Sequence, residues 1–247
     1  AEWFHPEYRK AACLRINITT PVGTVAAYLA AAAFIRMGNW RGSFYMAGIL
    51  MLLTAGIWMW IAGPLAESPV FQQETRPGKE RWNGDKAALS VLFVRAGIPT
   101  LFMALVAQGV LKDGITTWVP SFAEEQFGIS PALSVLGTVI LPIANISGVY
   151  LASSLERRIK KGELAASGAL FAVNVLLLGL LLFLKEAGLW VTYLLLAFAT
   201  TGMMGVNTLF ASCMPLAFAP WRKASSAAGI FNFCIYIGAA ISVWGTG

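Results

Sequence analysis

Residues 164–184 read "LAASGALFAVNVLLLGLLLFL" and contain no Asp, Glu, Lys or Arg. A helix needs roughly 20 apolar residues to cross the hydrocarbon core of a bilayer, and this stretch is long enough. Hydrophobic residues make up 57% of the 247-residue chain and charged residues only 12%, about half of what a soluble domain carries. Four further stretches are equally long and free of charge: 42–63, 129–155, 187–221 and 224–247.

This pattern predicts an all-α, polytopic membrane protein with about seven transmembrane helices. In lipid every backbone N–H and C=O must be satisfied internally, and a continuous helix does so. The expected spans are 11–35, 42–63, 96–121, 130–155, 164–184, 188–217 and 224–247.

A charged segment rich in Pro and Gly, "ESPVFQQETRPGKERWNGDKAALS" (67–90), separates the second span from the third. Its composition cannot build a hydrophobic core, so we interpret it as a soluble linker between two helical bundles. The predicted domains are the end of an N-terminal bundle with two helices (1–63), the linker (64–90) and a C-terminal bundle with five helices, the last truncated (91–247).

The distribution of basic residues predicts the orientation of these spans. Cytoplasmic loops of membrane proteins carry an excess of Lys and Arg. With residues 64–90 in the cytoplasm, that side holds most of the cations, and the other side holds Arg36, Arg41 and Lys185. The cytoplasmic set is Arg9, Lys10, Arg76, Lys79, Arg81, Lys86, Arg157, Arg158, Lys160, Lys161, Arg222 and Lys223. The net charge of +6 thus follows from basic residues that orient the chain in a cell (plasma or inner) membrane. It does not require nucleic acid as a partner.

Two adjacent charges lie within the third expected span, in "VLKDGITTWVPSF" (110–122). A lysine at mid-membrane costs on the order of 3 kcal/mol on insertion scales, so Lys112 is expected to face water or a partner. Adjacent helical residues point about 100° apart, so we do not expect Lys112 to bridge Asp113 directly. The alternatives are a purely structural pair, or a helix break at Gly114 that places both charges in an outer loop.

Several uncharged polar residues also lie within apolar spans. Most such residues form hydrogen bonds between membrane helices. Asn232 and Tyr236 are four residues apart and therefore share one helix face. Arg15 lies near the predicted cytoplasmic end of the first span, where its long side chain can reach the interface or a gate. The others are Asn17, Thr19, Thr20, Asn145, Asn174 and Asn207.

No catalytic or metal-binding motif accompanies these residues. The chain has no P-loop, GxSxG, CxxC or HExxH pattern, and its single histidine, His5, excludes a histidine-based metal site. We therefore expect no enzyme activity, no cofactor and no metal.

Several stretches resemble the major facilitator superfamily. "YRKAACLRINITTPVGTVAAYL" (8–29) is similar to its fifth span, and "NWRGSFYM" (39–46) to the connection between its fifth and sixth spans. More narrowly, "VLKDGITTWVPSF" and "SSAAGIFNFCIYIGAAIS" (225–242) resemble the seventh and eleventh spans of the organophosphate:phosphate antiporter branch. The resemblance implies that the chain is a fragment, spans five to eleven of a twelve-span carrier.

The resemblance also implies a substrate site. In that branch basic residues on the first and seventh spans grip the substrate phosphate, and the seventh-span cation falls on Lys112. A tyrosine on the eleventh span falls on Tyr236. The chain departs from the branch where Thr20 replaces a histidine and Gly205 a tyrosine, so the exact substrate carries over less well than the fold.

These observations predict a secondary active transporter that exchanges a small organic anion for phosphate by alternating access. The anion would be a phosphate ester of the glycerol-phosphate or sugar-phosphate type, and the protein a monomer in the lipid bilayer. Asp113 and Arg15 are candidate proton or gating residues. The alternatives are a proton-coupled symporter or drug exporter of the same fold, and a non-transporting membrane scaffold. The candidate substrate-binding residues are Lys112, Tyr236, Asn232, Thr20 and Asn17.

Overall fold

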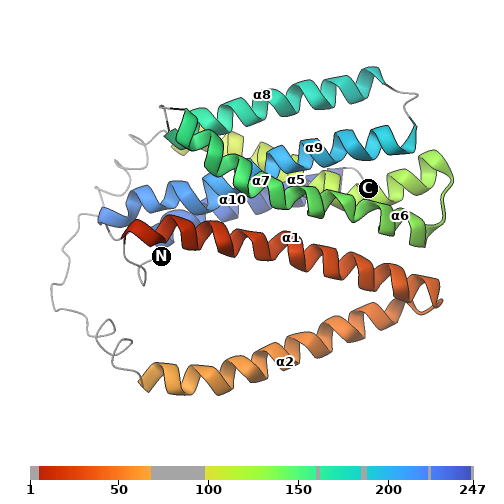
Figure 1. The fold of residues 1–247 in the computed structure, drawn as a ribbon, viewed down its shortest axis with the longest axis horizontal. Helices are drawn as coiled ribbons and strands as arrows, with labels where there is room; N and C mark the ends of the chain where they lie inside the picture. The colour runs from red at the N-terminus through yellow and green to blue at the C-terminus, as the bar shows by residue number, and fades with distance from the viewer. Residues whose placement is uncertain (1–5, 68–97, 160–161, 185–187, 222–223, 246–247) are drawn as a thin grey trace. The chain divides into compact units, whose positions relative to one another are not determined.

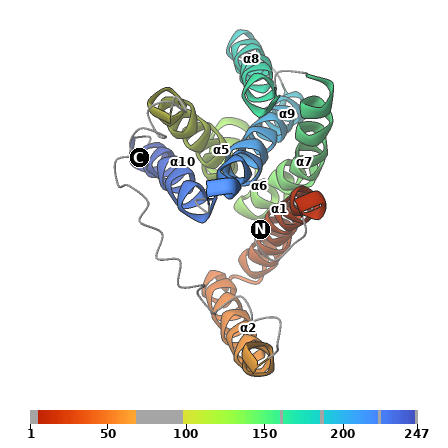
Figure 2. The same ribbon diagram turned by 90° about the vertical axis from the view of Figure 1, so that its left-hand side faces the viewer.

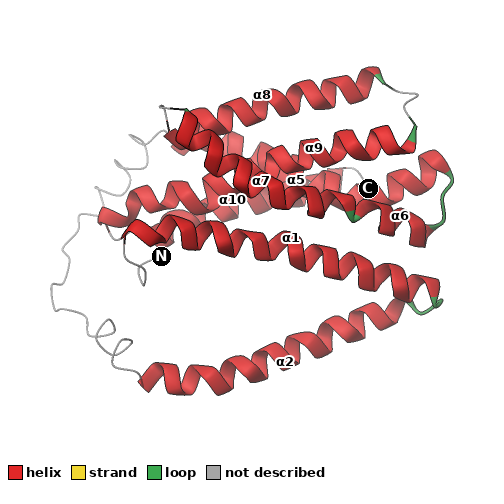
Figure 3. Ribbon diagram, viewed as in Figure 1, coloured by secondary structure: helices red, strands yellow, loops and turns green. Residues whose placement is uncertain are grey.

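The computed structural model describes residues 6–67, 98–159, 162–184, 188–221 and 224–245. These residues are helical apart from short turns and contain no strand, which confirms the all-α prediction (Figures 1 and 3). The elements are α1 (Pro6–Arg36), α2 (Trp40–Glu67), α5 (Ile98–Phe127), α6 (Pro131–Thr138), α7 (Ile140–Arg158), α8 (Gly162–Phe183), α9 (Leu189–Asn207), the π-helix η1 (Thr208–Cys213), the 3₁₀-helix η2 (Met214–Trp221) and α10 (Ala224–Gly245).

Within the described residues, six helical segments are long and apolar enough to cross a membrane. One of them, Pro131–Arg158, contains both α6 and α7, and another, Leu189–Phe218, continues from α9 through the π-helix. The third expected span, 96–121, corresponds to α5, which falls outside this set and carries the charged pair. At 30 residues α5 is about 45 Å long, enough to cross a bilayer.

The chain divides into two compact units, Ala1–Ala33 with Pro99–Gly247, and Phe34–Ile98. In the larger unit α9 is the central helix. It packs against both α7 and α8 (Figure 2), and 67% of the most apolar 18-residue stretch of Leu189–Phe218, the segment that includes α9, is buried. Gly148 on α7 lets the two backbones approach, because a Cβ there would lie 3.1 Å from the carbonyl carbon of Thr201 on α9.

A second close approach joins α5 to α10. A Cβ on Gly238 would lie 2.9 Å from the backbone carbon of Val106, and closer still to its carbonyl oxygen. A Cβ on Gly109 would meet the backbone of Ile235 in the same way. The two helices therefore cross backbone against backbone, which holds the central turns of α5 in place.

The far end of α5 is held by apolar packing and a tight turn. Val119 and Ala123 belong to a buried cluster with Leu141 and Tyr193, so this end of α5 packs on α7 and α9. Gly128 follows with φ 62° and donates its N–H to the Glu124 carbonyl at 2.9 Å, a conformation that favours glycine. These contacts position the charged middle of α5.

The smaller unit contains α2. Gly38, with φ 69°, makes the turn that precedes it, and the Asn39 N–H bonds the Phe34 carbonyl at 3.0 Å. No residue in the most apolar 18-residue stretch of α2 is buried, as expected for a helix that meets lipid or other helices. Residues 64–67 of the predicted linker continue α2, and residues 68–90 lie outside the described residues. The predicted division into two bundles and a linker stays a prediction.

Candidate functional site

The candidate site is built on the middle of α5, where Lys112 and Asp113 lie. The helix continues through both residues, so the alternative of a break at Gly114 is wrong. Gly114 is buried, and a Cβ there would lie 3.0 Å from the Ser242 side chain on α10. This close packing keeps the helix intact at a residue that otherwise weakens helices.

Lys112 and Asp113 form a direct ion pair. Lys112 Nζ donates to Asp113 Oδ1 at 2.6 Å, and the two side chains are 18% and 29% exposed. The expectation that adjacent residues would not bridge is therefore wrong. The reason is the flexible four-carbon stem of lysine, which brings the ammonium group back to its neighbour although the two Cβ atoms diverge.

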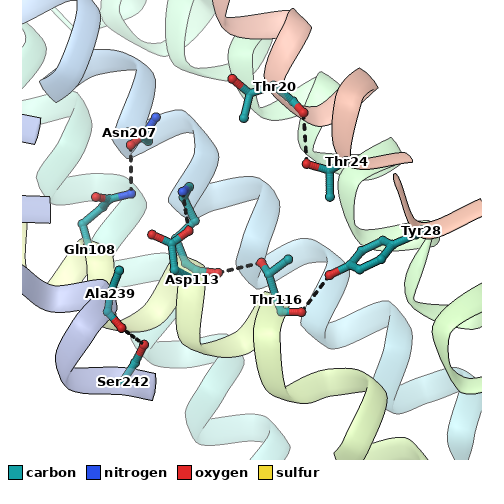
Figure 4. A network of polar contacts seen from close by, with 10 residues as sticks. Thr20, Thr24, Tyr28, Gln108, Asp113, Thr116, Asn207, Ala239 and Ser242 are labelled. Carbon is teal, nitrogen blue, oxygen red and sulfur yellow. Dashed lines mark hydrogen bonds and ion pairs between the residues drawn. The ribbon is translucent and has the colours of Figure 1, made fainter. Parts of the chain in front are cut away.

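Other polar side chains follow Lys112 along one face of α5. Gln108, Lys112 and Thr116 are spaced four residues apart, which places them one above another. Gln108 Nε2 donates to Asn207 Oδ1 on α9 at 3.3 Å, and Thr116 Oγ1 donates to the Lys112 carbonyl at 2.7 Å (Figure 4). Lys112 thus lies within a polar strip, formed with Gln108 and Thr116, on a helix whose middle is otherwise largely apolar.

A second polar strip lies on α1. Thr20, Thr24 and Tyr28 have the same four-residue spacing, and Thr24 Oγ1 donates to the Thr20 carbonyl at 3.0 Å. Tyr28 Oη donates to the Thr116 carbonyl at 2.8 Å, which ties the two strips together (Figure 4).

The structure joins some of the predicted site residues and leaves others apart. Asn17, on α1, donates to Ser212 Oγ in the π-helix at 2.6 Å and to the Cys13 carbonyl at 2.8 Å. Thr20 and Arg15 are exposed. On α10, Ile235 and Gly238 meet α5 and are buried, whereas Tyr236 is 68% exposed and Asn232 is partly buried. Their role in the site stays a prediction.

One contact ties the first turns of α1 to the end of α7. Lys10 Nζ pairs with Glu156 Oε1, with side chains 38% and 12% exposed. This ion pair lies at the end of α1 that the charge pattern assigns to the cytoplasmic side.

Sequence reasoning missed Gln108, Thr116 and Tyr28. The four-residue spacing of Gln108 and Thr116 about Lys112 was a usable signal for two of them. Tyr28 had no such signal, because its partner lies on a distant helix. Two hollows, of about 400 and 480 Å³, are lined by other residues of the described chain, and Lys112 borders neither. Among the described residues, no three His, Cys, Asp or Glu side chains lie together as metal ligands would.

Comparison with known proteins gives one match. The sequence profile of the Major Facilitator Superfamily matches residues 1–243, from the start of the chain through nearly all of α10. No curated protein and no solved structure matches the chain.

Proposed function

Because the chain belongs to the major facilitator superfamily of secondary transporters, we propose that its cargo is a small organic anion that binds at Lys112. Such carriers bind their cargo near the middle of the membrane, between helices that rearrange to expose the site to either side. Lys112 stands at the middle of α5, at the depth where that site is expected.

The observation that carries the proposal is the state of the Lys112 ammonium group. Ionisable side chains within a membrane are costly and usually functional. Lys112 has three N–H donors, and Asp113 is its one hydrogen-bond or ion-pair partner among the described residues. The side chain also keeps 18% of its surface exposed. An incoming anion therefore finds a cation with donors to spare.

Asp113 competes with an incoming anion for Lys112. The anion must displace the Asp113 carboxylate from the ammonium group, and the negative charge of Asp113 then lies near the bound anion. A phosphate ester competes well because it presents up to two charges and three acceptor oxygens. Inorganic phosphate returning in the opposite direction restores the starting state. The resemblance of residues 110–122 and 225–242 to the organophosphate:phosphate antiporter branch supports this choice of cargo.

The same contact favours a second candidate function, proton-coupled symport of the anion. When the anion binds Lys112, the partly buried Asp113 carboxylate loses its ion-pair partner. A proton would then neutralise the Asp113 carboxylate. In both versions the carrier is a monomer in the cell membrane with residues 64–90 in the cytoplasm, as the basic residues indicate.

Flux measurements on the full-length protein in liposomes test the proposal. Labelled sn-glycerol 3-phosphate should enter liposomes loaded with phosphate and should not enter empty ones. Lys112→Met should abolish this exchange, whereas Arg41→Gln, which removes an exposed cation over the Trp40 ring, should not. Exchange by Lys112→Met at the wild-type rate would remove the assigned role.

A second variant separates the two coupling modes. Asp113→Asn keeps the size of the side chain and removes its charge. If phosphate exchange drives transport, this variant retains uptake into phosphate-loaded liposomes. If protons drive it, wild-type uptake follows an imposed pH gradient without internal phosphate, and Asp113→Asn loses that response.

A further inference from the structure

We propose that Gln108 is a specificity-determining residue, whose side-chain carbonyl accepts a hydrogen bond from a hydroxyl group of the cargo. The inference rests on the proposed function, because it takes the charged group of that same cargo to be bound at Lys112. It narrows the cargo to small anions that carry a hydroxyl a few atoms from the charge.

The first observation is an unsatisfied atom. The Gln108 side chain is 0% exposed, yet its Oε1 has no hydrogen-bond partner among the described residues. Its Nε2 donates a hydrogen bond to Asn207 Oδ1 at 3.3 Å, a distance at the long end of the usual range. A buried carbonyl without a donor is costly, so such atoms call for an explanation.

The second observation is where this atom lies. Four other buried side-chain atoms share the condition, on Asn145, Glu156, Asn174 and Thr201. None of these residues is on α5, whereas Gln108 is one helical turn from Lys112 on the same face. Asn174 provides a comparison on another helix, because its amide donates to the Leu170 carbonyl at 2.8 Å and packs on Gly202, while its Oδ1 is also unpartnered among the described residues.

The spacing defines what fits. Residues four apart on a helix have Cβ atoms about 5–6 Å apart, so a cargo that meets both side chains must bridge a distance of about that order. A hydroxyl two or three carbons from a phosphate group spans that distance. An ammonium group in the same place would be repelled by Lys112, so a hydroxyl is the donor that suits the site.

The neighbouring hydroxyl groups point to the same chemistry. Thr116 Oγ1 and Tyr28 Oη both donate their hydrogens to backbone carbonyls, and so does Thr24. Because the hydrogen of each hydroxyl is already donated, its oxygen can only accept a further hydrogen bond. One turn from Lys112, Thr116 and its partner Tyr28 therefore offer acceptors, and a ligand that supplies donors complements them.

Gln108 is enclosed in this conformation, so the cargo reaches it only when α5 and α9 move apart. The contact that must break is the long bond between Gln108 and Asn207. Asn207 is the last residue of α9 before the π-helix Thr208–Cys213. Irregular helical segments of this kind are frequent at functional sites.

The experiment removes the proposed hydrogen bond in two ways, by taking the hydroxyl from the ester and by taking the carbonyl from Gln108. Competition against labelled sn-glycerol 3-phosphate exchange, with the full-length protein in phosphate-loaded liposomes, compares unlabelled sn-glycerol 3-phosphate with n-propyl phosphate, which lacks both hydroxyls. Wild type should favour the hydroxylated ester by about 3- to 10-fold, the usual range for one hydrogen bond. Gln108→Met should weaken sn-glycerol 3-phosphate to the level of n-propyl phosphate and leave n-propyl phosphate unchanged. Asn174→Leu, the matched control on α8, should keep the wild-type ratio.

Each other outcome has a defined meaning. Equal affinity of wild type for the two esters overturns the inference and leaves the proposed function intact, as does a Gln108→Met variant that weakens both esters equally. If wild type exchanges neither ester, the phosphate-ester cargo of the proposed function fails and the inference falls with it. If Gln108→Met does not reach the membrane, Gln108→Asn serves instead, because it keeps the amide, withdraws it by one methylene and should lower the ratio.

Discussion

The crossing of α5 and α10 allows a quantitative prediction about stability. In Gly238→Ala the new methyl carbon would lie 2.9 Å from both the backbone carbon of Val106 and the nitrogen of Val110. Carbon atoms pack best at about 3.5–4.0 Å, and the Val106 carbonyl oxygen is closer still, so the helices must separate by more than about 0.6 Å. Backbone atoms cannot turn aside as a side chain can, so relief requires movement of a whole helix.

The expected cost follows from two opposing terms. Overpacking typically costs about 1–3 kcal/mol, and the rigid surroundings place this site at the upper end. Replacing a helical glycine by alanine returns about 1 kcal/mol of helix propensity. The net loss is then about 2 kcal/mol, or roughly 4–8 °C in the melting temperature of a chain of this size.

Thermal unfolding in detergent, followed by tryptophan fluorescence, measures this loss. Gly229→Ala is the matched control, because Gly229 is exposed on the same helix and a Cβ there meets nothing within 4 Å. It should melt at or slightly above the wild-type temperature. A Gly238→Ala variant that melts with Gly229→Ala would refute the close crossing.

The partner glycine provides an internal check. Gly109→Ala should destabilise the protein as Gly238→Ala does, because its methyl group would lie 2.9 Å from the backbone carbon of Ile235. One separation of the helices makes room for both methyl groups. The double variant should therefore lose less than the sum of the two single variants. Strict additivity would mean that the two residues do not share one crossing point.

Two contacts of α1 give the remaining predictions. Lys10→Glu should lower the free energy of unfolding by about 1–3 kcal/mol, because it places a second carboxylate beside the largely buried Glu156. Combining it with Glu156→Lys should restore most of the loss in thermal unfolding, and a double variant no better than the single would exclude the ion pair. Asn17→Leu and Ser212→Ala each remove one hydrogen bond, and their double-mutant cycle should show a coupling of about 0.5–1.5 kcal/mol. A coupling of zero would show that these side chains do not interact.

Helix positions could be predicted closely from composition. The third span, expected at 96–121, corresponds to α5 at Ile98–Phe127, and the last, expected at 224–247, to α10 at Ala224–Gly245. Uncharged apolar runs mark spans well because the bilayer sets their length. The breaks within spans were less predictable. The junction of α6 and α7 and the π-helix after Asn207 have no comparable signal in composition.

The polar partners could not be predicted in the same way. The amino-acid sequence alone establishes that the chain is an all-helical membrane protein, which family it belongs to, and that one lysine lies at the middle of a span. Packing decides that Lys112 bends back to Asp113, that Gln108 meets Asn207, and that Tyr28 reaches Thr116. In water an apolar stripe shows which side of a helix faces the core. A membrane helix is apolar on the side facing lipid as well, so its pattern does not identify the neighbouring helix.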